Sequence, residues 1–167
     1  MKKITHITQN GFVRGRNFLN NILDIDSAGR LYSMKYECSD NKLNISNIPI
    51  SLASDFETAF PSIIHDWIWA VLRHRCLPLH FLNLFMGLYH KATAMYTHKG
   101  IIYTLICFLS GVLQGCPGSA FLFNNALDPF LHVMHKVLRS HNAGIVRACA
   151  DDIGASLRRL ASLKLLF

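Results

Sequence analysis

Two adjacent acids, Asp151 and Asp152, interrupt a stretch of mostly apolar residues that runs from position 143 to 157. Neighbouring carboxylates repel each other, and successive side chains of a regular strand point to opposite faces of a sheet. The chain therefore has to turn at this pair, which predicts a strand, a turn and a second strand over residues 143–157. A plain surface turn also accounts for an isolated pair of this kind, because Asp favours turns and bonds its own backbone.

The composition indicates a globular chain rather than a disordered one. The 167 residues are 51% hydrophobic and 16% charged, with a formal net charge of +7, enough for one domain or a large piece of one. The basic surplus suits phosphate backbones or anionic surfaces, although Lys and Arg are scattered. The five cysteines show no CxxC spacing, which argues against a disulfide framework and favours an intracellular location. Gly, Pro and Asn interrupt the uncharged stretch 100–127, so we expect no membrane span and no membrane partner.

The spacing of hydrophobic residues predicts a mixture of helices and strands. Expected helices cover residues 17–26, 63–73, 78–91 and 119–138, and another begins at 158. A buried strand is expected within residues 45–60 and a hairpin over residues 92–109. Trp67 is expected in the core. Because strands and helices do not alternate as βαβ units, the predicted fold class is α+β, an antiparallel sheet with helices on one face.

A third acid, Asp55, closes the strand expected within residues 45–60. If this strand lies beside the hairpin of residues 143–157, Asp55, Asp151 and Asp152 meet at one edge of the sheet. Such a cluster raises the pKa of each carboxyl group unless a cation balances the charge. Carboxylate oxygens suit Mg²⁺, and two such ions about 4 Å apart can hold the attacking and leaving oxygens of a phosphoryl transfer.

The order of motifs resembles that of the reverse transcriptases of non-LTR retrotransposons and their bacterial and group II intron relatives. Residues 9–16, QNGFVRGR, are similar to the fingers motif QxGFxxGR. Residues 55–67, DFETAFPSIIHDW, are similar to the first palm motif, and residues 111–123, GVLQGCPGSAFLF, to the second. Residues 149–152, CADD, are similar to the [FY]xDD box. These blocks span residues 9–157, nearly the whole chain.

The resemblance implies a role for each matching residue. Asp55 and Asp151 would be the main ligands of two Mg²⁺ ions, or Mn²⁺ in their place, with Asp152 the third acid and Phe56 giving its carbonyl. Phe60 matches the aromatic gate that rejects a 2′-hydroxyl, with a core aromatic as the alternative. The second palm motif and the fingers motif add three substrate contacts: Gln114 near the sugar of the nucleotide, Gly115 beside the nascent base pair, and Arg16 at the template or phosphate. A solvated arginine is the alternative for Arg16.

The implied reaction is RNA-directed DNA polymerisation, in which a primer hydroxyl attacks the α-phosphate of a deoxynucleotide on an RNA or DNA template. Some positions depart from the family pattern: Pro61 replaces an acid, and Cys149 replaces the aromatic residue of the last box. Gly118 and Ala120 replace the usual Leu and Pro. The loss of the ring at position 149 is expected to weaken activity.

The same resemblance implies an incomplete right-hand polymerase. Residues 1–44 would be partial fingers and residues 45–167 an incomplete palm, with residues 76–110 as a connecting helix and hairpin and no thumb. We expect weak or no processive synthesis from such a fragment. Two alternatives stay open: a non-enzymatic relic or basic nucleic-acid-binding domain of the same fold, and an unrelated basic domain in which Asp55 lies far from Asp151.

Overall fold

The computed structural model describes residues 5–39, 44–113 and 115–166. The chain divides into two compact units. The first unit contains residues 1–57 together with 127–167, and the second contains residues 58–126. These boundaries differ from the expected one at residue 44, and the division into fingers and palm stays a prediction.

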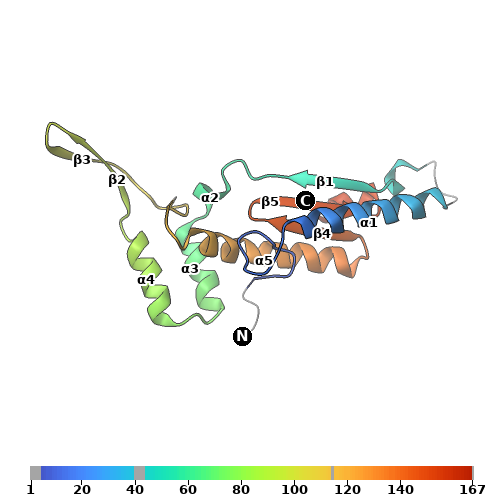
Figure 1. The fold of residues 1–167 in the computed structure, drawn as a ribbon, viewed down its shortest axis with the longest axis horizontal. Helices are drawn as coiled ribbons and strands as arrows, with labels where there is room; N and C mark the ends of the chain where they lie inside the picture. Colours follow the sequence, from blue (N-terminus) through green and yellow to red (C-terminus); the bar gives the residue numbers. More distant parts are fainter. Residues whose placement is uncertain (1–4, 40–43, 114, 167) are drawn as a thin grey trace. The chain divides into compact units, whose positions relative to one another are not determined.

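The first unit is built on a three-stranded antiparallel sheet in the order β1-β5-β4. Its strands are β1 (Ile50–Ser54), β4 (Gly144–Cys149) and β5 (Asp152–Leu157), and Figure 1 shows β5 between the other two. The β4–β5 hairpin confirms the strand, turn and strand predicted over residues 143–157. The mixture of helices and antiparallel strands confirms the α+β class.

Helix α1 (Leu19–Glu37) packs on one face of this sheet and is longer than expected. The predicted end at residue 26 is wrong, because the helix continues through Gly29 to Glu37. A Cβ added at Gly29 would lie 3.3 Å from the Ser51 Oγ of β1 and 3.6 Å from the Ser156 Oγ of β5. Close packing against the sheet stabilises the helix here, and it outweighs the weak helix propensity of glycine.

The opposite face of the sheet is the more deeply buried one. Its side chains alternate with those facing α1 and are almost inaccessible: Val146, Ala148, Ile153, Ala155 and Leu157. Helix α5 (Ser119–Ser140) supplies the buried Leu131 and Leu138 to the same unit. Helix α1 covers the first face, and the expectation that the helices share one face of the sheet stays a prediction.

The strand that leads to Asp55 is shorter and more exposed than predicted. A 3₁₀ turn, η1 (Ile45–Asn47), precedes β1, and the side chains of β1 are half-buried or exposed. The expectation of a buried strand is wrong because β1 is the edge strand of the sheet. The helix expected from residue 158 is instead a 3₁₀ segment, η2 (Leu160–Leu165).

The second unit contains α2 (Ala59–Ser62), α3 (His65–His74), α4 (Leu79–Tyr89) and the first turns of α5. The predicted helices over residues 63–73 and 78–91 are confirmed. Trp67, expected in the core, is 48% exposed, whereas Trp69 is 7% exposed. The buried stripe of α3 runs through Ile68 and Leu72 rather than through Trp67, whose Nε1 donates a hydrogen bond to the Ala126 carbonyl at 2.9 Å.

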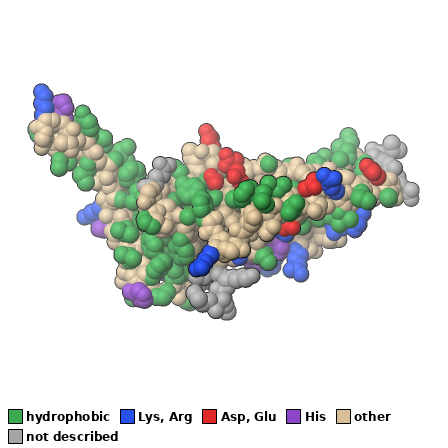
Figure 2. Space-filling model, in the orientation of Figure 1, with side chains coloured by type: hydrophobic (Ala, Val, Ile, Leu, Met, Phe, Trp, Pro, Cys, Tyr) green, Lys and Arg blue, Asp and Glu red, His purple; other side chains and the backbone are tan. Residues whose placement is uncertain are grey.

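The predicted hairpin is confirmed as β2 (Thr93–His98) and β3 (Ile101–Cys107). Its two-residue loop, Lys99 and Gly100, has positive φ at both positions, as a type I′ turn requires. All of β3 is exposed, including Ile102, Leu105 and Ile106. Figure 2 shows hydrophobic side chains along this hairpin, with basic and histidine side chains at its tip.

No described helix is both long and apolar enough to span a membrane. The five cysteines are free, and Cys38, Cys76 and Cys107 are exposed.

We predict that Leu72→Ala destabilises the second unit by about 2–5 kcal/mol, because Leu72 is 0% exposed and its loss leaves a cavity. Leu88→Ala is the matched control in α4, where Leu88 is 54% exposed, and should change stability by less than about 0.5 kcal/mol. Urea denaturation measures both. Equal losses for the two variants would contradict the packing described for this unit.

Candidate metal and nucleotide site

The acids Asp55, Asp151 and Asp152 come to the same end of the β1-β5-β4 sheet. The last paired residues of β1 and β5 are Ser54 and Ile153. Asp55 and Asp152 are the next residues beyond that pair, so they extend from neighbouring strands at one end of the ladder. Facing residues of antiparallel strands have Cβ atoms about 4.5–5.5 Å apart. Asp55 therefore follows β1 at the end of the ladder where Asp152 begins β5.

A tight turn carries the Asp-Asp pair. Cys149 pairs with Asp152, so Ala150 and Asp151 form a two-residue loop. Ala150 has a φ of 57° and is buried, whereas Asp151 is half-buried and Asp152 exposed. Positive φ at the first loop position only is the pattern of a type II′ turn, which normally takes glycine there. A non-glycine residue in this conformation has to be held by its surroundings.

The side chain of Gln9 holds this turn. Gln9 is fully buried, its Nε2 donates to the Ala150 carbonyl at 3.0 Å, and its Oε1 accepts from the Ala150 N–H at 2.8 Å. The same oxygen accepts from the Gly11 N–H at 2.8 Å. The backbone on either side of Gln9 also pairs with Ala148 of β4. The first block of the resemblance thus binds directly to the last one.

The absence of a side chain at Gly11 allows the segment around Gln9 to lie close to the backbone of Ala150. A Cβ added at Gly11 would lie 2.2 Å from the Ala150 backbone nitrogen, a distance that no side chain tolerates. From the sequence alone, Gln9 and Gly11 had no expected role beyond their match to a motif. The feature of the sequence that came nearest to predicting this contact was the position of both residues in the block QNGF.

Arg16 is half-buried, and backbone carbonyls hold its guanidinium. Its guanidinium donates to the backbone carbonyls of Thr5 at 3.0 Å, His6 at 2.5 Å and Gln9. The arginine therefore stabilises the loop that carries Gln9. A contact between Arg16 and a template stays a prediction.

The two aromatic residues of the first palm motif fall in different units. Phe56 belongs to the first unit, where its ring meets Phe130 edge-on at 6.4 Å. Phe60 belongs to the second unit and stacks on Phe123, with ring centroids 4.1 Å apart and an interplanar angle of 9°. The Phe60 ring is half-buried, so this contact fixes one of its faces. The proposed roles of the Phe56 carbonyl and of the Phe60 ring stay predictions.

Within the second unit, residues 60–63 bind the start of residues 111–118, which we call the Gly-rich loop. The Gly111 N–H donates to the Ile63 carbonyl at 2.7 Å, and the Val112 N–H donates to the Phe60 carbonyl at 2.9 Å. Gly111 has a φ of 85°, and a Cβ there would lie 2.8 Å from backbone atoms of Pro61. The two palm motifs are therefore joined through their backbones.

The remaining predicted contacts lie further along this loop. Gly115 has a φ of 85° and open space around the position of a Cβ, so its backbone is accessible on that side. Gln114 lies outside the described residues.

The three acids meet only some of the requirements of a metal-ion site. Asp55 follows β1 and Asp152 begins β5, so both carry carboxylates at the same end of the ladder, and Mg²⁺ is commonly bound by one or two carboxylates. Yet among residues 5–39, 44–113 and 115–166, no group of three or more His, Cys, Asp or Glu side chains is arranged to hold a metal ion. The structure therefore brings the acids to one place without gathering all of them around a common centre.

A histidine group that sequence reasoning missed lies elsewhere in the first unit. The His6 ring lies 5.3 Å from His132 and 5.0 Å from His135, measured between ring centroids. Burial, followed by the nearby His135, lowers the pKa of His6 below its usual range. The spacing of His132 and His135 gave no sign of His6, which is more than a hundred positions away.

The pKa of Cys149 depends on its burial and on the charges of the acid pair. Burial first, and then the charges of Asp152 and Asp151, raise the pKa of the Cys149 thiol above its usual range. A raised pKa means that less thiolate is present at neutral pH. Cys149 is thus a mostly protonated, neutral thiol beside the acids.

Comparison with known proteins gives one informative similarity. No protein-family model matches the chain. The chain is 29% identical over 108 residues to the "Transposon TX1 uncharacterized 149 kDa protein" of Xenopus laevis. The alignment covers 61% of this chain and 8% of that protein, so the chain spans less than a tenth of the relative's length. The chain is therefore similar to part of a transposon protein.

We predict that Gln9→Met, which keeps the volume and removes the hydrogen bonds, destabilises the first unit by about 2 kcal/mol or more. The variant leaves the buried N–H and C=O of Ala150 without their side-chain partner, and an unsatisfied buried group costs about 1–3 kcal/mol. Urea denaturation measures the loss, and amide hydrogen exchange at Ala150 should accelerate. Asn17→Ala, which removes an exposed hydrogen bond to the Leu19 N–H, is the control, with a loss of about 1 kcal/mol or less. Unchanged exchange at Ala150 would contradict the role of Gln9.

We predict that Asp152→Asn lowers the pKa of Cys149 toward its usual range, because the Asp152 charge disfavours the thiolate. At a fixed pH below that pKa, alkylation of Cys149 should therefore become faster. Mass spectrometry of the Cys149 peptide across a pH series measures the rate. Asp66→Asn in α3 is the control and should leave the profile unchanged. A profile that is identical in the Asp152 variant would show that the acid does not act on this thiol.

Proposed function

We propose that the chain is a retrotransposon-derived fragment of a reverse transcriptase, with the β1-β5-β4 sheet as the centre of its palm. The observation that carries the proposal is the register of β1 and β5, which brings Asp55 beside the Asp151–Asp152 turn. The two acid-bearing segments are almost a hundred residues apart in the sequence. An unrelated domain with an ordinary surface turn has no need to bring a third acid to that turn.

The pairing of the four motif blocks supports this proposal. Gln9 and Gly11 bind the turn of the last block, and residues 60–63 bind Gly111 and Val112 of the second palm motif. Each block thus contacts another block of the same resemblance within its own unit. The similarity to a transposon protein supports the retrotransposon origin.

In the proposed reaction, the chain's residues position charge. Asp55 and Asp151, with Asp152 as the third acid, would hold Mg²⁺ or Mn²⁺, and the ion would supply the positive charge that stabilises the transferring phosphoryl group. Gln9 would keep the turn in the conformation that presents Asp151 and Asp152. Phe60 would lie under the sugar of the incoming deoxynucleotide, with its ring fixed against Phe123. The primer and an RNA or DNA template would be the remaining partners.

A second candidate is a relic of the same fold that binds nucleic acid without catalysis. The observation in its favour is that the described residues contain no group of three or more ligand side chains arranged for a metal ion. In this case the acids persist at the sheet end but do not assemble around an ion. Metal binding separates the two candidates.

We predict that wild-type chain binds Mn²⁺, detected as loss of the free-ion signal in electron paramagnetic resonance, and that Mg²⁺ competes. Asp55→Asn, Asp151→Asn and Asp152→Asn should each weaken binding by at least about tenfold, because the loss of even an outer-shell partner has that effect. Any primer extension by the wild-type chain on an RNA template should disappear in Asp151→Asn.

The control for this measurement is Asp66→Asn, which removes an exposed acid from the first turn of α3. It should leave Mn²⁺ affinity unchanged. Absence of Mn²⁺ binding by the wild type, or equal weakening by Asp66→Asn, would contradict the polymerase proposal and favour the relic.

A further inference from the structure

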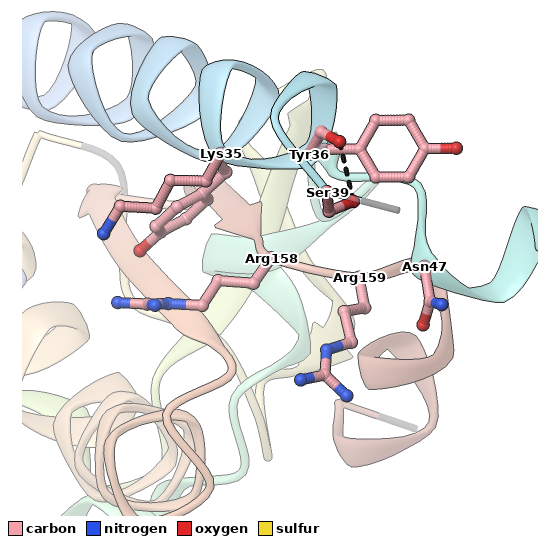
Figure 3. Close-up of a pocket in the computed structure, with 7 residues that line it drawn as sticks. Lys35, Tyr36, Ser39, Asn47, Arg158 and Arg159 are labelled. Atoms are coloured by element: carbon pink, nitrogen blue, oxygen red, sulfur yellow. Dashed lines mark hydrogen bonds between the residues drawn. The ribbon is translucent and has the colours of Figure 1, made fainter. Parts of the chain in front are cut away.

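A basic pocket lies in the first unit, at the end of the sheet opposite the acids. Its volume is about 320 Å³, and Figure 3 shows the side chains around it. The last turns of α1, the residue that ends η1, and the segment after β5 line it with Tyr32, Lys35, Tyr36, Ser39, Asn47, Arg158 and Arg159. Three of these side chains are cationic and none is acidic.

The cations of this pocket are not used by the fold as ion pairs. Across the part of the chain that the structure describes, Lys35, Arg158 and Arg159 have no carboxylate partner, whereas Arg30 and Arg147 pair with Asp26 and Asp24. The Nε of Arg158 is buried and has no hydrogen-bond acceptor among the described residues. A buried guanidinium nitrogen without an acceptor is costly, so the fold itself leaves part of the hydrogen-bonding capacity of Arg158 unused.

One of the cations is held in place before any ligand arrives. The Arg158 guanidinium carbon lies 4.9 Å from the centre of the Tyr32 ring, a cation–π contact, and Tyr32 is buried. The backbone N–H of Arg158 donates to the Ala143 carbonyl at 2.8 Å. In Figure 3 the Lys35 and Arg158 side chains extend to the same side of the pocket, while Arg159 extends along another side. A fixed guanidinium beside flexible cations is suited to an anion with several oxygens.

We propose that this pocket binds phosphate groups of a nucleic-acid backbone. The inference deepens the proposed function, because it names the surface that takes the template or primer, but it uses none of the residues at the acid end. A phosphodiester offers the oxygen acceptors that Arg158, Lys35 and Arg159 lack, and Asn47 and Ser39 add neutral polar groups. The formal net charge of +7 favours a polyanion over a single small anion.

The distance between the pocket and the acids suits a polymer. Asp152 begins β5, and Arg158 follows its last residue, Leu157. At about 3.4 Å per residue, six residues of strand separate the two positions by about 20 Å. A nucleic-acid strand advances about 3.4 Å per nucleotide, so about six nucleotides would connect the two ends of the sheet.

The experiment measures binding of a labelled single-stranded RNA of about 12 nucleotides by fluorescence anisotropy at several salt concentrations. Replacement of Lys35, Arg158 and Arg159 by Gln should weaken binding by about tenfold or more. The slope of log K against log salt should decrease by about 2, because each phosphate contact on a single strand contributes about 0.7. The double variant Lys35→Gln/Arg159→Gln, which keeps the Arg158–Tyr32 contact, should lower the slope by about 1.4.

The matched control removes the same charge from elsewhere. Arg73, Lys136 and Arg139 are exposed and lie outside the pocket, and their replacement by Gln should leave the slope unchanged. Wild-type affinity and slope in the double variant would overturn the proposal. Equal effects of the control set would also overturn it, because they would show attraction by net charge alone.

A competition arm distinguishes a nucleic-acid backbone from free phosphate. Inorganic phosphate at millimolar concentration should shift the Arg158 Nε–H signal only weakly, and the RNA should shift it strongly. Two results together would assign the pocket to free phosphate and overturn the proposal. These are a strong shift of the Arg158 Nε–H signal with inorganic phosphate, and RNA binding that is unchanged when the pocket cations are replaced. Mn²⁺ binding by the wild-type chain is measured separately and reports on the acids. If the pocket variants lose RNA binding while the wild-type chain binds no Mn²⁺, the proposed catalysis is rejected and this inference stands.

Discussion

Strand β5 is hydrogen-bonded along both of its edges, to β1 on one side and to β4 on the other. A slip of one residue in either pairing would reverse which face each side chain of that strand occupies. The alternation of Ile153, Ala155 and Leu157 toward the buried face prevents such a slip, because those side chains would then face α1 instead. The position of Asp152 beside Asp55 at one end, and of Arg158 beside Tyr32 at the other, is set by this one register.

The two units divide the first palm motif between them. Asp55 and Phe56 belong to the sheet, whereas Phe60 and the residues that bind the Gly-rich loop belong to the second unit. The other motif blocks do not cross in this way: the fingers block binds the last block, and the second palm motif binds residues 60–63. The division after Glu57 therefore falls inside this one block of the sequence.

Local patterns made part of this fold predictable. The hairpin of residues 143–157, the hairpin around Lys99 and Gly100, and helices α3 and α4 follow from hydrophobic spacing and turn residues close in sequence. The convergence of Asp55 with the Asp-Asp pair needed only the added assumption that β1 lies beside that hairpin. The α+β class follows from the same elements.

What the sequence did not reveal depends on contacts between distant residues. Helix α1 passes Gly29 because the sheet packs there, and Trp67 is half exposed because the buried stripe of α3 runs through Ile68 and Leu72. The hydrogen bonds of Gln9 to Ala150 join residues 141 positions apart. Neither periodicity nor motif spacing predicts which single side chain will bond a residue so far away in the sequence. The contact between Tyr32 and Arg158 could not be predicted for the same reason.

The exposed hairpin β2–β3 has a consequence for how the chain responds to its surroundings. A two-stranded hairpin is marginal in water when nothing packs on it, and every side chain of β3 is exposed. Little apolar contact has to be broken for these strands to separate, so this segment would open locally long before either core unfolds. The backbone around Lys99 and Gly100 would then become accessible to a protease while both cores stay folded.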